Sequence, residues 1–189
     1  MAETNNIKFK TLEPSDFAAL VSLAIDVHGQ GYVDLAIIGQ WYQQGIYEDI
    51  NAGFVAYNNH QLIGYRITFA AQHWQIDQWC SPTKWQVPPA RVCYFKCNTI
   101  ESHYRGLGIG AQLLKLSAAA AKAQGAQAGI AHLWMQSPAN SAVQYFTHCG
   151  GQYVATHLSR WNADSAKGYV CTLCANDCHC DAQEMILYF

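Results

Sequence analysis

The stretch Arg105-Gly106-Leu107-Gly108-Ile109-Gly110-Ala111 is the most informative part of this 189-residue sequence. Three glycines fall within five residues, after a predicted strand over 91–100 and at the start of a predicted helix over 108–124. Glycine lets the backbone come close to a ligand, and the free N–H groups of a helix start favour a phosphate. The sequence therefore predicts an anion-binding turn between this strand and this helix.

Two other phosphate-binding motifs do not fit this turn. Gly106, Gly108 and Ala111 match the spacing of the dinucleotide fingerprint, but that fingerprint also needs an acid about 20 residues further on. No Asp or Glu occurs between Glu101 and Asp164. A P-loop is excluded as well, because its Gly-Lys-Ser/Thr ending is missing from the sequence.

A different pattern, Arg105-x-x-Gly108-x-Gly110, resembles the pyrophosphate loop of the GNAT superfamily of acyl-CoA N-acyltransferases. Its surroundings are similar too, because Ile100 and Tyr104 stand where the family has a hydrophobic strand end and an aromatic residue before Arg-Gly. Asn140 opens a predicted helix that ends at two glycines, much like the family's second cofactor segment. The resemblance covers the whole chain and implies a single domain over residues 1–189.

The expected element order is typical of that fold. It is a mixed α/β domain whose central sheet is mostly antiparallel, with a splayed parallel pair and flanking helices. The splayed strands would be Val92–Ile100 and Ile130–Met135, which in the family separate to admit the pantetheine arm of CoA. Residues 73–90, with three tryptophans and three prolines, form a loop that either walls a pocket or packs on the core. Periodicity predicts the other strands at 7–11, 52–57, 62–70, 152–160 and 185–189, and the other helices at 17–28, 34–44 and 140–149.

The resemblance implies that acetyl-CoA is the cosubstrate. Backbone N–H groups of the turn would hold its pyrophosphate, and the end of the preceding strand would pair with the pantetheine arm. The residues expected to bind the cofactor are Asn98, Thr99, Ile100, Arg105, Gly106, Leu107, Gly108, Ile109, Gly110, Ala111 and Asn140.

Acyl transfer to an amine needs one group that removes a proton from the ammonium, whose pKa is about 10, and one that protonates the CoA thiolate. Glu101 is the only acid near the turn and is the candidate base; otherwise it is a solvated charge at a strand end. Tyr145 is the candidate acid, although the family's tyrosine position, counted from the helix-ending glycines, falls on Phe146 or Thr147 here. If Tyr145 is instead a core aromatic residue, Thr147, His148 or water would serve.

Four of the eight cysteines fall in Cys171-x-x-Cys174-x-x-x-Cys178-x-Cys180, between the last two predicted strands. Four thiolates within ten residues can bind one tetrahedral Zn²⁺, although structural zinc sites usually separate two ligand pairs by a longer stretch. The alternatives are reduced thiols on a β-hairpin over 171–180 and a redox-sensitive disulfide pair.

Composition restricts the class of protein. Apolar residues make up 51% of the chain and charged residues 13%, which is unlike a disordered protein. The formal net charge of −2 argues against nucleic-acid binding, and no apolar run is long enough to span a membrane. The first six residues lack the basic and apolar regions of a signal peptide, so we expect a cytoplasmic protein. Residues 102–163, which contain both expected cofactor segments, hold four basic residues and no acid, as suits a polyanion such as CoA.

The sequence thus predicts an N-acetyltransferase that moves an acetyl group from acetyl-CoA to an amine by direct attack in a ternary complex. The acceptor is a small molecule or a peptide, the chain is a monomer or a homodimer, and protein N-termini, polyamines, aminoglycosides and amino acids all stay open as acceptors. The alternative is a catalytically degenerate acyl-CoA-binding domain that senses metal or redox state through its cysteine hairpin. Some aromatic residues point either to a flat or cationic acceptor or to core packing, namely Trp41, Tyr42, Trp74, Trp79 and Trp85.

Overall fold

A computed structural model of the chain describes residues 6–189; residues 1–5, on which the signal-peptide expectation rests, lie outside the described part. The strands are β1 (Ile7–Thr11), β2 (Ile46–Tyr47), β3 (Ile50–Asn51), β4 (Phe54–Asn58), β5 (Gln61–Phe69), β6 (Val92–Ile100), β7 (Ala128–Trp134), β8 (Gln152–His157) and β9 (Ala182–Tyr188). The α-helices are α1 (Phe17–His28), α2 (Leu35–Gln44), α3 (Ile109–Ala123), α4 (Ser141–His148) and α5 (Asn162–Ser165). Short 3-10 turns cover Pro14–Asp16, Pro82–Lys84, Pro89–Arg91, Ser102–Tyr104 and Pro138–Asn140. Within residues 6–189, no helix has the length and apolarity needed to cross a bilayer.

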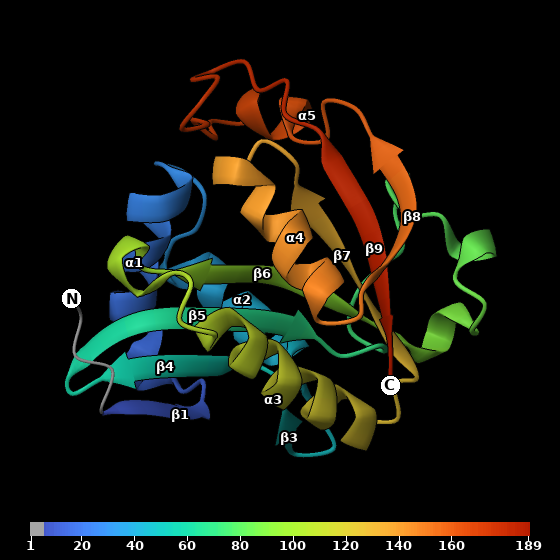
Figure 1. Ribbon diagram of the computed structural model, residues 1–189, viewed down its shortest axis with the longest axis horizontal. Helices are drawn as coiled ribbons and strands as arrows, with labels where there is room; N and C mark the ends of the chain where they lie inside the picture. The colour runs from blue at the N-terminus through green and yellow to red at the C-terminus, as the bar shows by residue number, and fades with distance from the viewer. Residues whose placement is uncertain (1–5) are drawn as a thin grey trace.

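One seven-stranded sheet in the order β1-β4-β5-β6-β7-β9-β8 forms the centre of the molecule (Figure 1). Its neighbouring strands pair antiparallel, except for β6 and β7, which pair in parallel. The last strand, β9, inserts between β7 and β8. The expected mixed sheet with one parallel pair is therefore confirmed.

Helices cover both faces of this sheet, with α3 and α4 in front of it and α1 and α2 behind it in Figure 1. Behind, Leu20 of α1 and Ile38 of α2 are fully buried in one cluster with Ile67 of β5. In front, Phe146 of α4 is buried in a second cluster with Phe95 of β6. Successive side chains of a strand point to opposite faces, so β6 contributes to both cores.

The parallel pair β6–β7 is short and opens into a fork. Val92–Tyr94 pairs with Ala128–Ile130, and beyond these residues β7 pairs with β9 while β6 pairs with β5. The register between β5 and β6 also shifts here, so that Lys96 has no partner residue on β5. One edge of β6 is therefore free beside β7, which confirms the expected splay; we call this opening the β6–β7 fork.

Helix α5 was not expected, β9 begins at Ala182 and not at residue 185, and three further segments differ from the sequence-based expectation. Residues 46–51 form the hairpin β2–β3, whose strands of two residues are too short to show a period. Strand β8 ends at His157 because Ser159 adopts a left-handed φ of 51°. The expected β-hairpin over 171–180 is a loop with one isolated bridge from Cys171 to Ala175, whose φ of 57° reverses the chain before a ladder can form.

Candidate active site

The glycine turn, residues 105–111, joins β6 to α3 through the Ser102–Tyr104 turn. Gly106 and Gly108 have φ angles of 76° and 77°, a left-handed conformation that side chains disfavour. No described atom lies within 4 Å of the place that a Cβ would occupy on either glycine. The turn therefore presents bare backbone to an open space, where a ligand can approach it closely.

The start of α3 completes an anion site beside this turn. The first intrahelical hydrogen bond runs from the Gln112 N–H to the Gly108 carbonyl (3.0 Å), so the N–H groups before Gln112 have no intrahelical acceptor. Gly108 supplies no capping side chain, and the first turn of α3 contains no acid. Because the N-terminal end of a helix is partially positive, these residues fit a pyrophosphate.

Two amide oxygens, one on β6 and one before α4, are buried and unpaired in the described part of the chain. The Oδ1 atoms of Asn98, on β6, and of Asn140, before α4, are buried without a hydrogen-bond partner among residues 6–189. The Nδ2 of Asn98 lies 3.0 Å from where a Cβ of Gly110 would stand, so this side chain adjoins the first turn of α3. Leaving a buried acceptor unpaired is costly. A ligand with N–H groups, such as the amide-containing arm of CoA, would satisfy both oxygens.

The remaining predicted cofactor residues lie at the end of β6. Thr99 is buried, and its hydroxyl is 2.7 Å from Nε2 of His28 on α1. Burial lowers the pKa of His28 to about 4, so its ring is neutral. Arg105 donates from Nε to the Ile100 carbonyl (3.1 Å), which folds this exposed side chain over the strand end, next to the glycine turn.

Tyr145 of α4 lies on the same face of the sheet as the glycine turn. Its ring is 3.7 Å from the place of a Cβ on Gly110, and Arg66 donates from Nη2 to its hydroxyl oxygen at 2.6 Å. Arg66 itself is only 1% exposed, and its guanidinium lies 4.8 Å from the ring centroid of Phe95. Burial raises the pKa of the Tyr145 phenol, against the opposing effect of Arg66. The hydroxyl is therefore protonated at neutral pH.

Glu101 is part of a local cap at the end of β6. Its carboxylate accepts from the His103 N–H (3.2 Å), lies 2.8 Å from Nδ1 of the same residue, and accepts from the Ser102 hydroxyl (2.9 Å). Burial opposes the change, but the hydrogen bonds from His103 and Ser102 lower the pKa of Glu101, which makes it a weaker base. Its role as general base stays a prediction.

A pocket of about 190 Å³, which we call the fork pocket, opens between the two fork strands. Tyr94 and Lys96 of β6 and His132 of β7 line it. Tyr94 packs against the core under α1 and α2, whereas Phe95 packs under α3 and α4. The fork pocket and the glycine turn therefore lie on opposite faces of the sheet. Four other segments complete its lining, through Trp41, Gln44, Phe69, Trp74, Gln75, Asp77, Cys80 and Arg160.

Two cations lie in the fork pocket. Lys96 Nζ is 4.8 Å from the ring centroid of Trp41, and no acid among residues 6–189 comes within ion-pair distance of it. Arg160 is 3.6 Å from Asp77 and stacks on Trp79. Burial lowers the pKa of Lys96; the Arg160 charge acts in the same direction, and Cys97, Asp164 and Asp77 act against it. The pocket thus disfavours any further positive charge.

The aromatic loop over 73–90 both walls the fork pocket and packs on the core. Trp74 lines the pocket, while Trp85 is fully buried. The fully buried carboxylate of Glu184, on β9, accepts from the Trp85 Nε1 (2.7 Å) and from the Ser81 N–H (3.0 Å). These bonds fasten the loop to the sheet, so both alternatives for this segment hold.

Histidines that are far apart in the sequence meet behind this loop. His132, His157 and Glu184 lie close enough together to hold a metal ion. The ring of His132, however, is bonded on both sides, to the Tyr94 hydroxyl (3.2 Å) and to the Trp79 carbonyl (2.5 Å). Burial lowers the pKa of His132 to about 4, and His157 is already bonded to Glu184 at 2.9 Å. In this arrangement the group fastens the loop to β7, β8 and β9.

Sequence reasoning missed two residues of this site, Arg66 and Lys96. Each is a single cation inside an otherwise apolar strand, at Tyr65-Arg66-Ile67 and Phe95-Lys96-Cys97. Charged side chains are rarely buried without a partner, so this position in a strand was the available signal. The four cysteines predicted as metal ligands lie elsewhere, in the loop between β8 and β9.

The chain is similar to known proteins in both sequence and fold. The family model described as "Acetyltransferase (GNAT) family" matches residues 28–150, whereas a search of curated proteins found no match. Among solved structures, the NatC complex bound to Gag peptide and CoA has a chain that superposes with a TM-score of 0.70 at 14% identity, covering 97% of this chain and 99% of that chain. YncA of Salmonella typhimurium, solved with acetyl-CoA, gives a TM-score of 0.69 at 15% identity, covering 97% and 94%.

A third structure is the ribosomal-protein-S18-alanine N-acetyltransferase from Escherichia coli, with a TM-score of 0.65 at 13% identity, covering 96% of this chain and 93% of that chain. At such identities the structures establish a shared fold. The family match is of another kind, because it rests on the sequence and spans more than half of the chain. The chain therefore belongs to the GNAT acetyltransferase family.

Proposed function

We propose that this chain is an acetyl-CoA-dependent N-acetyltransferase whose acceptor is an α-amine, such as the N-terminus of a peptide. The observation that carries the proposal is the β6–β7 fork, which has an anion-binding turn on one face and a cation-lined pocket on the other. A thioester that enters from the first face and an amine that enters from the second would meet between β6 and β7.

The chain's own groups suit acetyl-CoA on the α3–α4 face. The N–H groups of residues 107–111 would bind the pyrophosphate, with Arg105 beside it. Asn98 and Asn140 would bind the pantetheine amides through the oxygens that are otherwise unpaired. When bound, acetyl-CoA supplies an activated acetyl group, and the fork fixes its orientation, which is itself a large part of the rate gain.

Lys96 is the residue we assign to the proton of the acceptor. An acceptor ammonium in the fork pocket would be repelled by the partly buried Lys96 ammonium. The acceptor and Lys96 together would therefore hold fewer protons than they would in water. The proton that is lost passes to solvent, because the Lys96 ammonium has no free electron pair to accept it, and a neutral acceptor amine remains. Glu101 is the alternative base. In that case the acceptor amine would lose its proton at the C-terminal end of β6, where Glu101 is bonded to Ser102 and His103.

Tyr145 is the residue we assign to the departing thiolate. Its phenol is protonated, adjoins Gly110 and is oriented by the hydrogen bond from Arg66. Donation of its proton to the CoA sulfur would leave a phenolate beside the Arg66 guanidinium, which would stabilise that charge. Arg66 is thus a positioning residue for Tyr145.

The acceptor class follows from the charge of the fork pocket. An α-amine has a pKa of about 8 and a lysine side chain one of about 10.4, so the α-amine reaches its neutral form at lower cost. Polyamines and aminoglycosides carry several positive charges that Lys96 and Arg160 would repel. Two of the similar structures, the NatC complex with its Gag peptide and the S18-alanine enzyme, are described with peptide or protein substrates, which supports the same choice.

A CoA-release assay against a panel of amines tests the proposal. The panel pairs a peptide that has a free α-amine with the same peptide blocked at its N-terminus and carrying one lysine, and adds spermidine. We expect release only with the free α-amine. Release only with spermidine would overturn the acceptor class, and tight CoA binding without release for any amine would favour the degenerate binding domain.

A further inference from the structure

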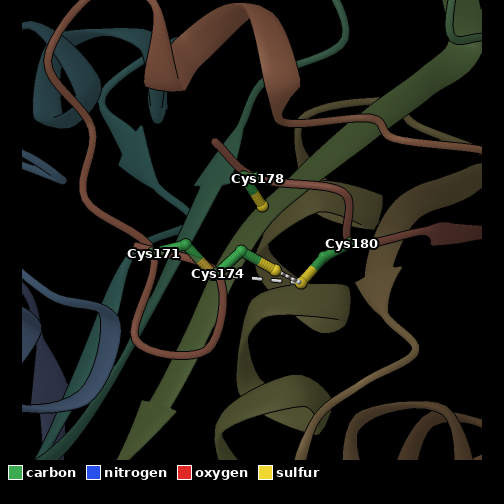
Figure 2. A group of neighbouring side chains, drawn as sticks. All are labelled: Cys171, Cys174, Cys178 and Cys180. Atoms are coloured by element: carbon green, nitrogen blue, oxygen red, sulfur yellow. Dashed lines mark hydrogen bonds between the residues drawn. The ribbon is translucent and has the colours of Figure 1, made fainter. Parts of the chain in front are cut away.

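The loop between β8 and β9 brings four cysteines together. Cys171, Cys174, Cys178 and Cys180 point toward one another, as Figure 2 shows, and their Sγ atoms all lie within 4.8 Å of one another. The Sγ of Cys180 is 3.9 Å from that of Cys171 and 3.6 Å from that of Cys174. The cluster lies outside the β6–β7 fork and supplies no reacting or ligand-binding group to the proposed acetyl transfer.

These sulfur separations match a tetrahedral zinc site. A disulfide would need sulfurs about 2.05 Å apart. Four sulfurs at about 2.3 Å from a central Zn²⁺ stand about 3.8 Å from one another by the geometry of a tetrahedron. The separations of the Cys180 sulfur from those of Cys171 and Cys174 lie on either side of this value. The sulfurs are therefore spaced as ligands of one ion and too far apart for disulfides.

The backbone around the cluster favours thiolates. The N–H of Leu173 donates to the Sγ of Cys171 at 3.4 Å, and a hydrogen bond of this kind stabilises negative charge on sulfur. Cys171 and Ala175 are joined by two backbone hydrogen bonds, of 2.9 and 3.0 Å, which close the turn that carries Cys171 and Cys174. Aromatic side chains pack on the outside of the cluster, namely Trp134, Trp161 and Tyr169.

The loop has little regular structure and only a small apolar core of its own. Between the end of β8 and the start of β9, residues 158–181 contain only the four-residue helix α5 and the single bridge. Leu158 and Leu173 are exposed, at 71% and 61%, so the loop buries few of its own large apolar side chains. A chain segment with so small a core needs a cross-link, and a bound metal supplies one.

We propose that Cys171, Cys174, Cys178 and Cys180 bind one structural Zn²⁺ as four thiolates. Four protein ligands fill the tetrahedral coordination of zinc, so no position is open for water or substrate, and the site is structural and not catalytic. The sequence spacing left reduced thiols and a disulfide pair as alternatives, and the geometry favours the metal over both.

The loop over 158–181, which carries the four cysteines, also contacts the segment that leads to the fork pocket, where the acceptor is proposed to bind. Val170 donates its N–H to the Gln30 carbonyl at 3.2 Å, and Tyr169 lies against Tyr32 with ring centroids 6.3 Å apart. Gly31 fits close to the Gly168 carbonyl, where a Cβ would stand at 2.6 Å. These contacts fix the turn between α1 and α2, and α2 contributes Trp41 to the fork pocket. Loss of zinc should thus raise the KM for the acceptor and leave CoA binding unchanged.

Metal content of the full-length chain, purified without chelator under reducing conditions, tests this inference. We expect about one equivalent of zinc by mass spectrometry of the metal, and less than about 0.2 equivalents in Cys174→Ser and Cys178→Ser. Cys149→Ser, which changes a cysteine outside the cluster, should keep its zinc. Less than about 0.2 equivalents in the wild-type chain, with none gained when Zn²⁺ is added back, would overturn the proposal.

A second readout covers variants that fail to fold. Replacing zinc by Co²⁺ in the wild-type chain should give the visible absorption of a tetrahedral cobalt–thiolate site, and its absence would count against four cysteine ligands. Both readouts are independent of acetyl transfer. A zinc-loaded chain without transferase activity would leave this inference intact and contradict the proposed function, whereas an active, metal-free chain would do the reverse.

Discussion

Under the proposed function, the two faces of the β6–β7 fork would recognise their ligands with different parts of the chain. On the α3–α4 face, recognition rests mainly on backbone, through two left-handed glycines and the uncapped start of α3. On the α1–α2 face, the fork pocket is formed by side chains from separate segments, with Lys96 and Arg160 as its cations. Backbone recognition needs a short contiguous sequence, whereas side-chain recognition is assembled by the fold. The seven residues of the glycine turn are therefore enough to predict the cosubstrate, whereas the acceptor can be inferred only from the folded structure.

The largest effect should come from filling the space in front of the glycine turn. Gly108→Trp places a large side chain where CoA would lie, and we expect acetyl-CoA affinity to fall more than about 100-fold, below detection by calorimetry. Gly125→Trp is the matched control, because Gly125 also has a positive φ and lies just past the other end of α3. Equal affinity in both variants would show that the turn does not bind CoA.

Removing one hydroxyl on the same face should slow the chemistry and spare binding. Tyr145→Phe keeps the packed ring but removes the proton donor, so kcat should fall roughly 100-fold with little change in acetyl-CoA affinity. Steady-state kinetics and calorimetry measure the two quantities, and Tyr153→Phe, an exposed tyrosine, is the control. An unchanged kcat would remove Tyr145 from the mechanism.

A change on the opposite face should alter the pH dependence. Lys96→Met removes the nearby cation, so the pKa of the bound acceptor ammonium rises and less of the amine is neutral at pH 7. We expect kcat/KM for a peptide α-amine to fall about tenfold at pH 7, with the acid limb of the pH profile moved to higher pH. Lys115→Met, on the exposed side of α3, should leave the profile in place. If the pH profile of kcat/KM moves in Glu101→Gln but not in Lys96→Met, deprotonation of the acceptor depends on Glu101 as general base and not on Lys96.

The smallest effect should come from the side chain beside the turn. Arg105→Ala removes one exposed charge while the backbone donors remain, so acetyl-CoA affinity should fall only about fivefold and lose part of its salt dependence. Arg91→Ala is the control, since Arg91 also donates to a backbone carbonyl, that of Gly125 (3.1 Å), past the far end of α3. A loss as large as that of Gly108→Trp would mean that side chains dominate on this face too.

The sequence was sufficient to predict those elements that are determined by residues close together in the chain. The glycine turn and the helix after it were both predicted for this reason. The parallel pair joins β6 to β7, which are distant in the sequence, and was expected only through the family resemblance. The position of Tyr145 was harder to judge from a count along the sequence. Ala139 and Asn140 both have a φ of 53° and turn the chain into α4, and such a turn leaves no trace in residue spacing.

Other features depend on contacts between distant residues. Arg66 and Tyr145 are 79 residues apart, and the clamp formed by Glu184 joins β9 to a loop about 100 residues earlier. The bulge that leaves Lys96 unpaired exists only through the register of β5 against β6. Pairings of this kind are set by the packed sheet, so neither periodicity nor motif spacing could predict the fork pocket.

The most direct test follows an isotope-labelled acetyl group from acetyl-CoA in the presence of wild-type chain and a peptide with a free α-amine. The label should appear on the peptide α-amine, and none should remain on the protein, because the amine attacks the thioester directly within the fork. Label that stays on CoA with every acceptor, or that accumulates on the chain itself, would contradict the proposed transfer.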